Sequence, residues 1–358
     1  MEFRLGELFS GPGGLAYGAH LASSDVEGAS IAHAWASDYD RDTCDTYIAN
    51  IPGAAKATVH CEDVRSINLG KLGAIDAFAF GFPCNDFSVV GEQRGMDGAF
   101  GPLYSYGVSV LRTHQPKWFV AENVAGIRNA NEGHAFEVIT NEMRESGYKL
   151  VPHLYQFDKY GVPQARRRVL IVGIRDDVTT EFRVPSPRPY QEVDVSSRTA
   201  LEVPPIPEGA TNHDRTRQSP SVVERLGYIQ PGENAFTAEM PDRLRLNVQG
   251  AKISQIYKRL HPDRPSYTVT GSGGGGTHVY HWDEPRALTN RERARLQSFP
   301  DRFVFSGSRE SVRKQIGMAV PVEGARAVLG AVLKSFADVD YESIEPNISL
   351  SSIPALRA

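Results

Sequence analysis

Cysteine is scarce in this 358-residue sequence, which has three residues of this type: Cys44, Cys61 and Cys84. An odd and sparse set cannot build a fully paired disulfide framework, so we expect free thiols in a reducing compartment. Long apolar runs are also missing, since none approaches the ~18 residues of a membrane-spanning helix. The first residues, MEFRLGELFS, have neither the basic start nor the apolar core of a signal peptide. These absences predict a cytoplasmic protein that does not enter a membrane.

The sequence has no large excess of charge of either sign, because its formal net charge is -4. A polyanionic partner would therefore need local basic patches. Two basic windows lie late in the chain: residues 212–260 have eight Lys/Arg against five Asp/Glu, and residues 286–314 have eight against three. Most of these bases are arginine, whose planar fork suits phosphates and guanine edges. A solvated surface is the alternative interpretation of each window.

Residues 1–175 alternate short apolar segments with helix-like segments, the pattern of an α/β fold in which helices cover both faces of a parallel sheet. The expected strands are FRLGELF, IAHAWASD, AIDAFAF, KWFVAEN, YKLVPHLY and RRVLIVGI, with a further short strand ahead of Asp63. The expected helices are GLAYGAHLA, RDTCDTYIAN, PLYSYGVSVLRTH and AFEVITNEMRES. This order predicts a Rossmann-like sheet.

The rest of the chain is less regular. Residues 183–210 are rich in proline and predict a linker or an extended wrap, and residues 211–285 show weak periodicity and contain GSGGGG. Thr289 followed by Glu292 fits a capping box, so a helix should begin there and stop at Pro300. We expect a last helix over residues 311–337 and a mobile polar tail after it.

A glycine-rich loop follows the first expected strand. Gly11, Gly13 and Ala16 match G-x-G-x-x-[GA], which lets a backbone approach a ligand closely between a strand and a helix. Asp38 ends the second strand, where a carboxylate can accept both ribose hydroxyls of an adenosine, and Asp63 is placed to meet an adenine edge. Together these features favour a dinucleotide or S-adenosylmethionine over a simple tight turn.

Reactive side chains follow the next expected strands. Cys84 comes directly after Gly81-Phe82-Pro83, Glu122 opens ENV, and the arginine run QARRR opens a later strand. Because strand ends on one edge of a parallel sheet face the same cleft, a thiol and a carboxyl should meet above a bound cofactor. A small buried cysteine and a helix cap are the alternatives for Cys84 and ENV.

The motifs occur in the order FSGPGG, Asp38-Tyr39, GFPCNDFS, ENV, QARRR, RALTNRERARLQSFPDRF and QIGMAVPV. With this order the chain resembles the C5-cytosine DNA methyltransferases of bacterial restriction-modification type over nearly its whole length. Each motif alone is a modest signal, whereas all of them in register are very specific.

The resemblance implies a role for each matching residue. It makes Cys84 the nucleophile, Glu122 the acid at cytosine N3, and Arg166 and Arg168 their electrostatic partners. The implied S-adenosylmethionine site comprises Phe9, Ser10, Gly11, Pro12, Gly13, Gly14, Asp38, Tyr39, Asp63, Val64, Gly81, Pro83, Asn85, Leu103, Met318, Ala319 and Val320. The expected DNA contacts are Ser88, Arg215, Arg217, Arg243, Arg245, Lys252 and Arg259, and no metal site is expected.

The resemblance also implies a division into domains. Residues 1–185 would form the catalytic and cofactor-binding domain, and residues 186–283 a smaller, irregular target-recognition domain. Residues 284–312 would form a hinge that braces the DNA backbone, a helix over 313–337 would return to the catalytic domain, and 338–358 would form the tail. The expected partner is double-stranded DNA, bound by a monomer that can act beside a separate restriction endonuclease.

The chemistry of the implied reaction explains these residue types. Carbon 5 of cytosine is a poor nucleophile until a thiolate adds at C6 and turns the ring into an enamine. Cys84 therefore needs nearby positive charge, for which Arg168 is the candidate, and Glu122 would hydrogen-bond or protonate N3. A base then removes the C5 proton and the thiol leaves. The target base must be flipped out, since C6 is inaccessible inside a duplex.

Two positions depart from the family pattern. Asn85 replaces the usual glutamine after the catalytic cysteine, and Met318 replaces the usual asparagine of the last motif. We expect Met318 to fill the space that Asn85 opens, with S-adenosylmethionine still the donor. The alternative is a donor with a larger or charged group on sulfur, such as carboxy-S-adenosylmethionine. Further alternatives are a transfer-RNA cytosine-5 methyltransferase, an inactive DNA-binding relative, and a nicotinamide oxidoreductase, which would leave Cys84 and Glu122 unexplained.

Overall fold

The computed structural model describes residues 1–82, 103–247, 254–271, 273–274 and 276–350. The chain divides into two compact units. The first unit contains residues 1–156, 167–189 and 324–358, and the second unit contains residues 157–166 and 190–323. The division after residue 189 falls inside the proline-rich segment in which we expected a linker.

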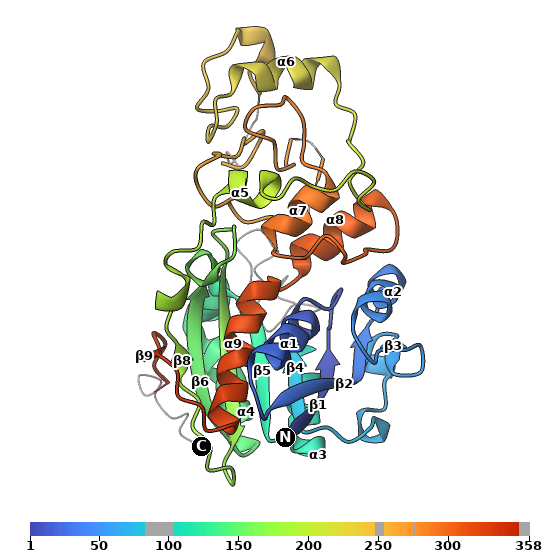
Figure 1. Ribbon diagram of the computed structural model, residues 1–358, viewed down its shortest axis with the longest axis vertical. Coiled ribbons are helices and arrows are strands. Elements are labelled where there is room, and N and C mark those ends of the chain that lie inside the picture. Colours follow the sequence, from blue (N-terminus) through green and yellow to red (C-terminus); the bar gives the residue numbers. More distant parts are fainter. Residues whose placement is uncertain (83–102, 248–253, 272, 275, 351–358) are drawn as a thin grey trace. The chain divides into compact units, whose positions relative to one another are not determined.

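The first unit is built on a seven-stranded sheet with the order β3-β2-β1-β4-β5-β7-β6 (Figure 1). The strands are β1 (Glu2–Leu8), β2 (Ser30–Asp38), β3 (Val59–Cys61), β4 (Ala77–Phe80), β5 (Trp118–Val124), β6 (Tyr148–Gln156) and β7 (Arg167–Arg175). Strands β1 to β5 run parallel to one another. The expected α/β, Rossmann-like class is confirmed.

The expectation of a parallel sheet is wrong for β7 alone, because β6 runs in the same direction as β5. Strand β7 runs antiparallel to both β5 and β6. Only residues 157–166 join β6 to β7, and a parallel pair needs a crossover of a dozen or more residues, usually a helix. The reversal has a consequence for the site, because Arg168 at the start of β7 becomes the ladder partner of Val124 at the end of β5.

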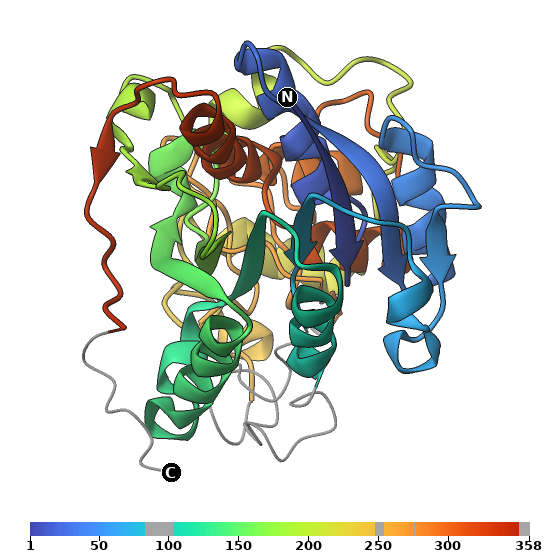
Figure 2. The same cartoon turned by 90° about the horizontal axis from the view of Figure 1, so that it is seen from below.

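Helices cover both faces of this sheet, as Figure 2 shows. Those nearest the sheet are α1 (Gly14–Asp25), α2 (Arg41–Asn50), α3 (Tyr104–His114), α4 (His134–Glu145) and α9 (Val322–Phe336). On one face, Phe3 packs edge-on against Phe336 of α9, with ring centroids 4.8 Å apart. On the other face, Phe78 and Phe80 of β4 join one apolar cluster with residues of α3 and α4. The two faces of the sheet thus pack against separate layers of helices.

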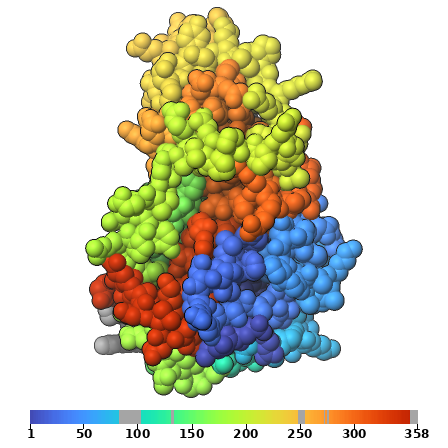
Figure 3. Space-filling model, in the orientation of Figure 1, coloured from blue at the N-terminus to red at the C-terminus, as the bar shows by residue number. Residues whose placement is uncertain are grey.

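The C-terminal residues pack onto the first unit, so the expectation of a mobile tail is wrong for residues up to 350. Strand β9 (Ser343–Ile344) pairs with β8 (Val184–Pro185). The side chain of Asn347 accepts a hydrogen bond from the Leu154 N–H at 2.8 Å. Figure 3 shows C-terminal residues in red against N-terminal residues in blue, and Arg326 pairs with Asp25 at 2.6 Å. Hydrogen bonds order this polar segment, and its composition does not show them.

The second unit contains short helices joined by long irregular segments. Its helices are α5 (Ser197–Glu202), α6 (Pro220–Tyr228), α7 (Asn290–Leu296) and α8 (Arg309–Met318). A small apolar cluster around Leu226 and Tyr280 forms part of its interior. The capping box expected at α7 is confirmed, since Thr289 and Glu292 bond reciprocally to each other's backbone N–H.

The single last helix expected over residues 311–337 is wrong, because two helices occupy this segment. Helix α8 ends at Met318 and α9 begins at Val322. Pro321 lies between the two helices. It has no N–H to continue α8, and it disfavours the helical backbone conformation in the residue before it. Proline is tolerated next to a helix start, so α9 can begin directly after it.

One stretch within the described part of the chain, Arg309–Phe336, is long and apolar enough to cross a membrane by length and composition. In its most apolar window, 78% of the residues are buried inside the protein. Burial of this extent is typical of core helices, and the break after Met318 interrupts the stretch.

Helix α8 packs closely against the backbone of residues 270–271 at Gly317. A Cβ at this position would lie 2.0 Å from the Gly271 nitrogen and 2.2 Å from the Thr270 carbonyl carbon, and neither backbone atom can turn aside. We expect Gly317→Ala to lower the free energy of unfolding by about 2–3 kcal/mol in urea titrations. The matched control is Gly227→Ala in α6, where an added Cβ meets open space. That change should be neutral or stabilise by up to ~1 kcal/mol. Equal effects of the two changes would contradict this packing.

Candidate active site

The glycine loop after β1 has a backbone that few residue types can adopt. Gly11 and Gly13 have φ of 56° and 95°, and Phe9 has φ of 55°, which is rare for a residue with a side chain. A Cβ on Gly13 would meet Ile51 at 2.9 Å, whereas a Cβ on Gly11 would meet nothing within 4 Å. The loop therefore has an open side at Gly11. Strained backbone of this kind gathers at ligand sites.

Asp38 fixes this loop from the end of β2. Its carboxylate accepts the Gly11 N–H at 3.0 Å and the Asp40 N–H at 3.1 Å. Burial is the main influence on this carboxyl and raises its pKa, against the lowering effect of the backbone N–H donors. Each carboxylate oxygen can accept more than one hydrogen bond, so Asp38 retains acceptor capacity for a ligand.

Other predicted cofactor contacts differ in exposure. Tyr39 is 62% exposed, Val64 is buried, and Leu103 is the half-buried N-cap of α3. Asp63 caps the turn Val64–Ser66, and its hydrogen bonds from Arg65 lower the pKa of its carboxyl to about 2. Asp63 is therefore ionised at any ordinary pH.

A buried acid behind the loop was missed in the sequence. Glu7 is 1% exposed and accepts a hydrogen bond from the Tyr47 hydroxyl, and Tyr47 also lies next to the position that a Gly13 Cβ would occupy. Burial raises the pKa of the Glu7 carboxyl to about 7. The available signal was a lone carboxylate among the apolar residues of FRLGELF.

The ends of β4 and β5 are tied together. Asn123 is buried, and its side-chain amide donates to the Phe82 carbonyl at 3.2 Å. A Cβ at Gly81 would lie 3.1 Å from Glu122 Oε2, so glycine leaves room for this carboxylate. Asn123 thus has a positioning role that was not assigned from the sequence.

Glu122 and Arg168 form the charged pair of this edge. Arg168 Nε donates to Glu122 Oε1 at 2.9 Å, and the two side chains are only 14% and 13% exposed. A pair this sheltered is less screened than a surface pair. The structure therefore brings together Glu122, Arg168, Gly81 and Asn123. Pro83, Cys84, Asn85, Ser88 and Lys252 lie outside the described residues.

Arg166 belongs to the second unit and has a different environment from Arg168. It is 1% exposed, and its Nη1 donates to the Val269 carbonyl at 3.2 Å. Gln164 is also buried, accepts the Val269 N–H at 2.8 Å and donates to Gln297 Oε1 at 3.0 Å. The first residues of QARRR thus anchor the segment around Val269.

The last predicted cofactor contacts also lie in the second unit. Met318 is 59% exposed, whereas Ala319 and Val320 are buried. The expected filling of the space beside Asn85 by Met318 stays a prediction, because Asn85 lies outside the described residues.

The predicted DNA-contacting arginines fall into two groups. Arg215, Arg217, Arg243 and Arg245 are exposed. Arg259 is 6% exposed, and its guanidinium donates to the carbonyls of Leu226, Ile229, His281 and Glu284. The prediction of Arg259 as a DNA contact is wrong for this structure, because its donors are used inside the second unit.

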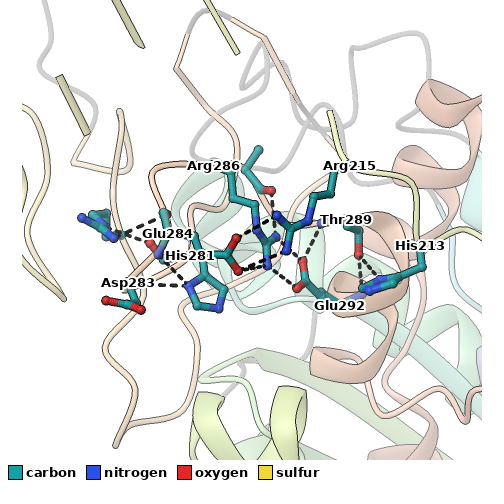
Figure 4. Close-up of polar contacts among 10 residues, drawn as sticks. His213, Arg215, His281, Asp283, Glu284, Arg286, Thr289 and Glu292 are labelled. Carbon is teal, nitrogen blue, oxygen red and sulfur yellow. Dashed lines mark hydrogen bonds and ion pairs between the residues drawn. The ribbon is translucent and has the colours of Figure 1, made fainter. Parts of the chain in front are cut away.

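Arg215 is joined to a buried network at the start of α7, shown in Figure 4. Glu284 accepts from Arg215 at 2.9 Å and from Arg286 at 3.0 Å. Arg286 also makes two 2.8 Å hydrogen bonds to Glu292. These carboxylates raise the pKa of Arg286 against the lowering effect of burial, its largest influence. The outer arginine is therefore held by an internally anchored carboxylate.

Four arginines of the basic window 286–314 are largely enclosed by the second unit and are therefore not free surface charges. Arg291 and Arg293 are almost fully buried, and Arg286 and Arg295 are 12% and 9% exposed at the side chain. Three of the four are held by carboxylates or carbonyls of the second unit. A count of charges along the sequence cannot separate such internal arginines from surface ones.

The comparisons with known proteins now identify the family. The model of the C-5 cytosine-specific DNA methylases matches residues 3–334. The chain belongs to this DNA methylase family. Its relatives include the Type II methyltransferase M.BbvI of Brevibacillus brevis, 54% identical over 366 residues, which cover 99% of this methylase and 97% of the relative. The Type II methyltransferase M.NgoFVII of Neisseria gonorrhoeae is 39% identical over 94% of this chain and 88% of its own.

Solved structures share the fold of this methylase. A prophage-encoded E. coli protein described as a DNA modification methyltransferase has a TM-score of 0.71 at 22% identity, covering 93% of this chain and 99% of its own. The S. pombe Dnmt2 methyltransferase has a TM-score of 0.59 at 18% identity, covering 94% of this chain and 99% of its own. The family model and the curated relatives confirm the family predicted from the motifs. No three His, Cys, Asp or Glu side chains gather to hold a metal among the residues that the structure describes.

The buried Glu7 of this methylase should make stability depend on pH. Its pKa of about 7 in the folded state exceeds the ordinary glutamate value of 4.5, so its contribution to stability is complete below ~4.5 and is lost as pH rises through ~7. Glu7→Gln keeps an acceptor for Tyr47 and removes the charge. We expect its melting temperature to exceed that of the wild type at pH 8, with a difference that shrinks toward pH 5. Exposed Glu2→Gln on the same strand is the control, and a pH-independent difference for Glu7→Gln would contradict the burial argument.

Proposed function

We propose that this protein is a sequence-specific DNA (cytosine-5-)-methyltransferase that takes its methyl group from S-adenosylmethionine. The observation that carries the proposal is the sheltered Glu122–Arg168 pair, on the edge of the sheet where the Asp38-bound glycine loop also lies. The reaction needs an acid, a bound methyl donor and a thiol. The Glu122 carboxyl, held by Arg168, would be the acid, and the glycine loop at the same edge of the sheet would bind the donor. Cys84 is the thiol.

The residues of the glycine loop fit this donor. Gly11 leaves open space where a Cβ would stand, and Asp38 has acceptor capacity for ribose hydroxyls. Phe9, Asp63, Val64 and Leu103 would hold the adenosine beside them. When bound, S-adenosylmethionine supplies an electrophilic methyl group. The adaptable Met318 favours this donor over a carboxylated analogue, because it offers no positive charge to a carboxylate.

In the proposed mechanism, Cys84 forms a bond to C6 of a flipped cytosine. Glu122 holds or protonates N3 as negative charge develops on the ring. Arg168 fixes Glu122 through Oε1, which leaves Oε2 for N3 of the flipped cytosine. Gly81 has no side chain to crowd Oε2. After methylation a base removes the C5 proton, and the C6–sulfur bond breaks to release the thiolate.

The names of the relatives support a Type II restriction-modification role, in which methylation protects DNA from a separate endonuclease. We assign recognition of the DNA sequence to residues 186–283. We also propose that the enzyme is a monomer and acts in the cytoplasm. Transfer RNA remains the alternative substrate.

The role of Cys84 can be tested by covalent trapping. Duplex DNA with 5-fluorocytosine at the target should form a complex that survives denaturation and requires S-adenosylmethionine, because fluorine cannot leave as a proton does. Cys84→Ala should abolish this complex while DNA binding persists, as judged by denaturing gels beside filter binding. Cys44→Ala is the matched control and should still trap DNA. A trapped complex with the Cys84→Ala protein would refute the assignment.

The exposed arginines can be tested as DNA contacts. We expect Arg217→Ala to weaken binding to the cognate duplex by about 1–3 kcal/mol and to relax specificity there, as lost base readout should. Arg112→Ala, which removes an exposed arginine in the last turn of α3 in the first unit, is the control for lost charge. Competition between cognate and altered duplexes in titrations measures both effects. The same specificity in all three proteins would contradict readout by Arg217.

A further inference from the structure

Helix α7 carries two buried arginines, Arg291 and Arg293, and a third, Arg295, whose side chain is 9% exposed, and the three have unequal sets of partners. Arg291 donates to the carbonyls of Thr211, Pro300 and Phe303 and to the Thr211 hydroxyl. Arg295 makes two hydrogen bonds to Asp301, at 2.9 and 2.6 Å. These two side chains have the acceptors that a buried guanidinium needs.

Arg293, between them on the same helix, lacks such acceptors. It is 1% exposed, and its contact is a 3.2 Å approach of Nη2 to His278 Nδ1. Its Nη1 is buried and has no hydrogen-bond partner. None of the described carboxylates forms an ion pair with it, and Glu292 beside it is bound to Arg286.

Arg313 of α8 is a second incompletely satisfied guanidinium near His278. Its Nε is buried without a partner, and its Nη2 donates weakly to the Gly273 carbonyl at 3.3 Å. Its nearest carboxylate is that of Glu310, 3.9 Å away and 85% exposed, a contact of little strength. The Arg313 side chain is 14% exposed, so part of it reaches the surface.

The side chains around Arg293 and Arg313 do not compensate the positive charge of these two arginines. Burial, together with the positive charges of Arg293 and Arg313, lowers the pKa of His278 to about 4, so this ring is neutral at pH 7. Burial raises the pKa values of Tyr267 and Tyr280, so these phenols are neutral too. Burial lowers the pKa of Arg293 to about 10, which still leaves it charged. Two positive charges therefore share a low-dielectric environment.

We propose that Arg313, supported by the buried charge of Arg293, forms an anion site that binds one phosphate group of the DNA backbone. This inference rests on the proposed function. Arg313 is the contact residue because it reaches the surface, and Arg293 acts through the electrostatic potential at Arg313. A charge buried without a partner is costly in the free protein, and an incoming anion lowers that cost. Gly273 permits the arrangement, since a Cβ there would lie 2.3 Å from Arg313 Nε.

The test uses full-length protein with Arg313→Gln and Arg293→Met, and measures duplex affinity against salt concentration. We expect Arg313→Gln to weaken binding roughly tenfold and to reduce the slope of log K against log salt by about one, as loss of one phosphate contact should. Arg293→Met should weaken binding by several-fold while raising the melting temperature of the free protein. Arg293→Lys, which keeps the charge, should restore most of the affinity.

A purely structural arginine would behave in the opposite way. The matched control is Arg295→Met, which removes a paired arginine of the same helix and should lower the melting temperature. Arg112→Gln on α3 controls for the loss of one exposed charge. If Arg313→Gln and Arg293→Met both bind DNA with the affinity and slope of Arg112→Gln, the proposal is overturned.

Inorganic phosphate separates the two sources of the anion. It should raise the melting temperature of the wild type more than chloride at equal ionic strength, and should do so less for Arg313→Gln. Stabilisation by phosphate without any change in DNA binding would assign the site to a free anion and overturn the DNA assignment. A wild type that binds no duplex would refute the proposed function, and the phosphate measurement would still report on the anion site.

Discussion

The ion pair between Glu122 and Arg168 depends on one reversal of strand direction. Because β7 runs antiparallel to β5, its first residues lie beside the last residues of β5. A parallel β7 would begin at the opposite edge of the sheet, far from the glycine loop and Asp38. The short connection between β6 and β7 enforces the reversal. One topological constraint thus joins the carboxylate at the end of β5, its guanidinium partner and the glycine loop on the same edge of the first unit.

Arginine has two roles in this protein, and burial separates them. In the second unit Arg259, Arg286, Arg291 and Arg295 hold irregular segments by donating to carbonyls or carboxylates. This is how a unit with short helices and long irregular segments satisfies its buried polar groups. Exposed arginines such as Arg217 stay available to a polyanion. Arg293 and Arg313 fit neither group, and this exception is what points to a ligand.

Much of the fold could be predicted from the sequence, because local signals were strong. Strands such as AIDAFAF and the capping box of Thr289 and Glu292 are set by patterns within a few residues. The direction of β7, the packing of the tail through Asn347 and the burial of Arg259 depend on contacts between distant segments. The glycine loop, Asp38 and Glu122 could be found because their motifs are local. Glu7 and Asn123 were missed because their roles arise from the side chains around them.

The most direct test of the central claim is mass spectrometry of the nucleosides formed when the purified protein acts on duplex DNA with S-adenosylmethionine, beside transfer RNA under the same conditions. The account predicts 5-methyl-2′-deoxycytidine from the duplex and no methylated cytidine from the transfer RNA. Methylation of the transfer RNA alone would contradict the proposed substrate. With native cellular cofactors in place of added S-adenosylmethionine, a deoxycytidine adduct heavier than methyl would contradict the proposed donor.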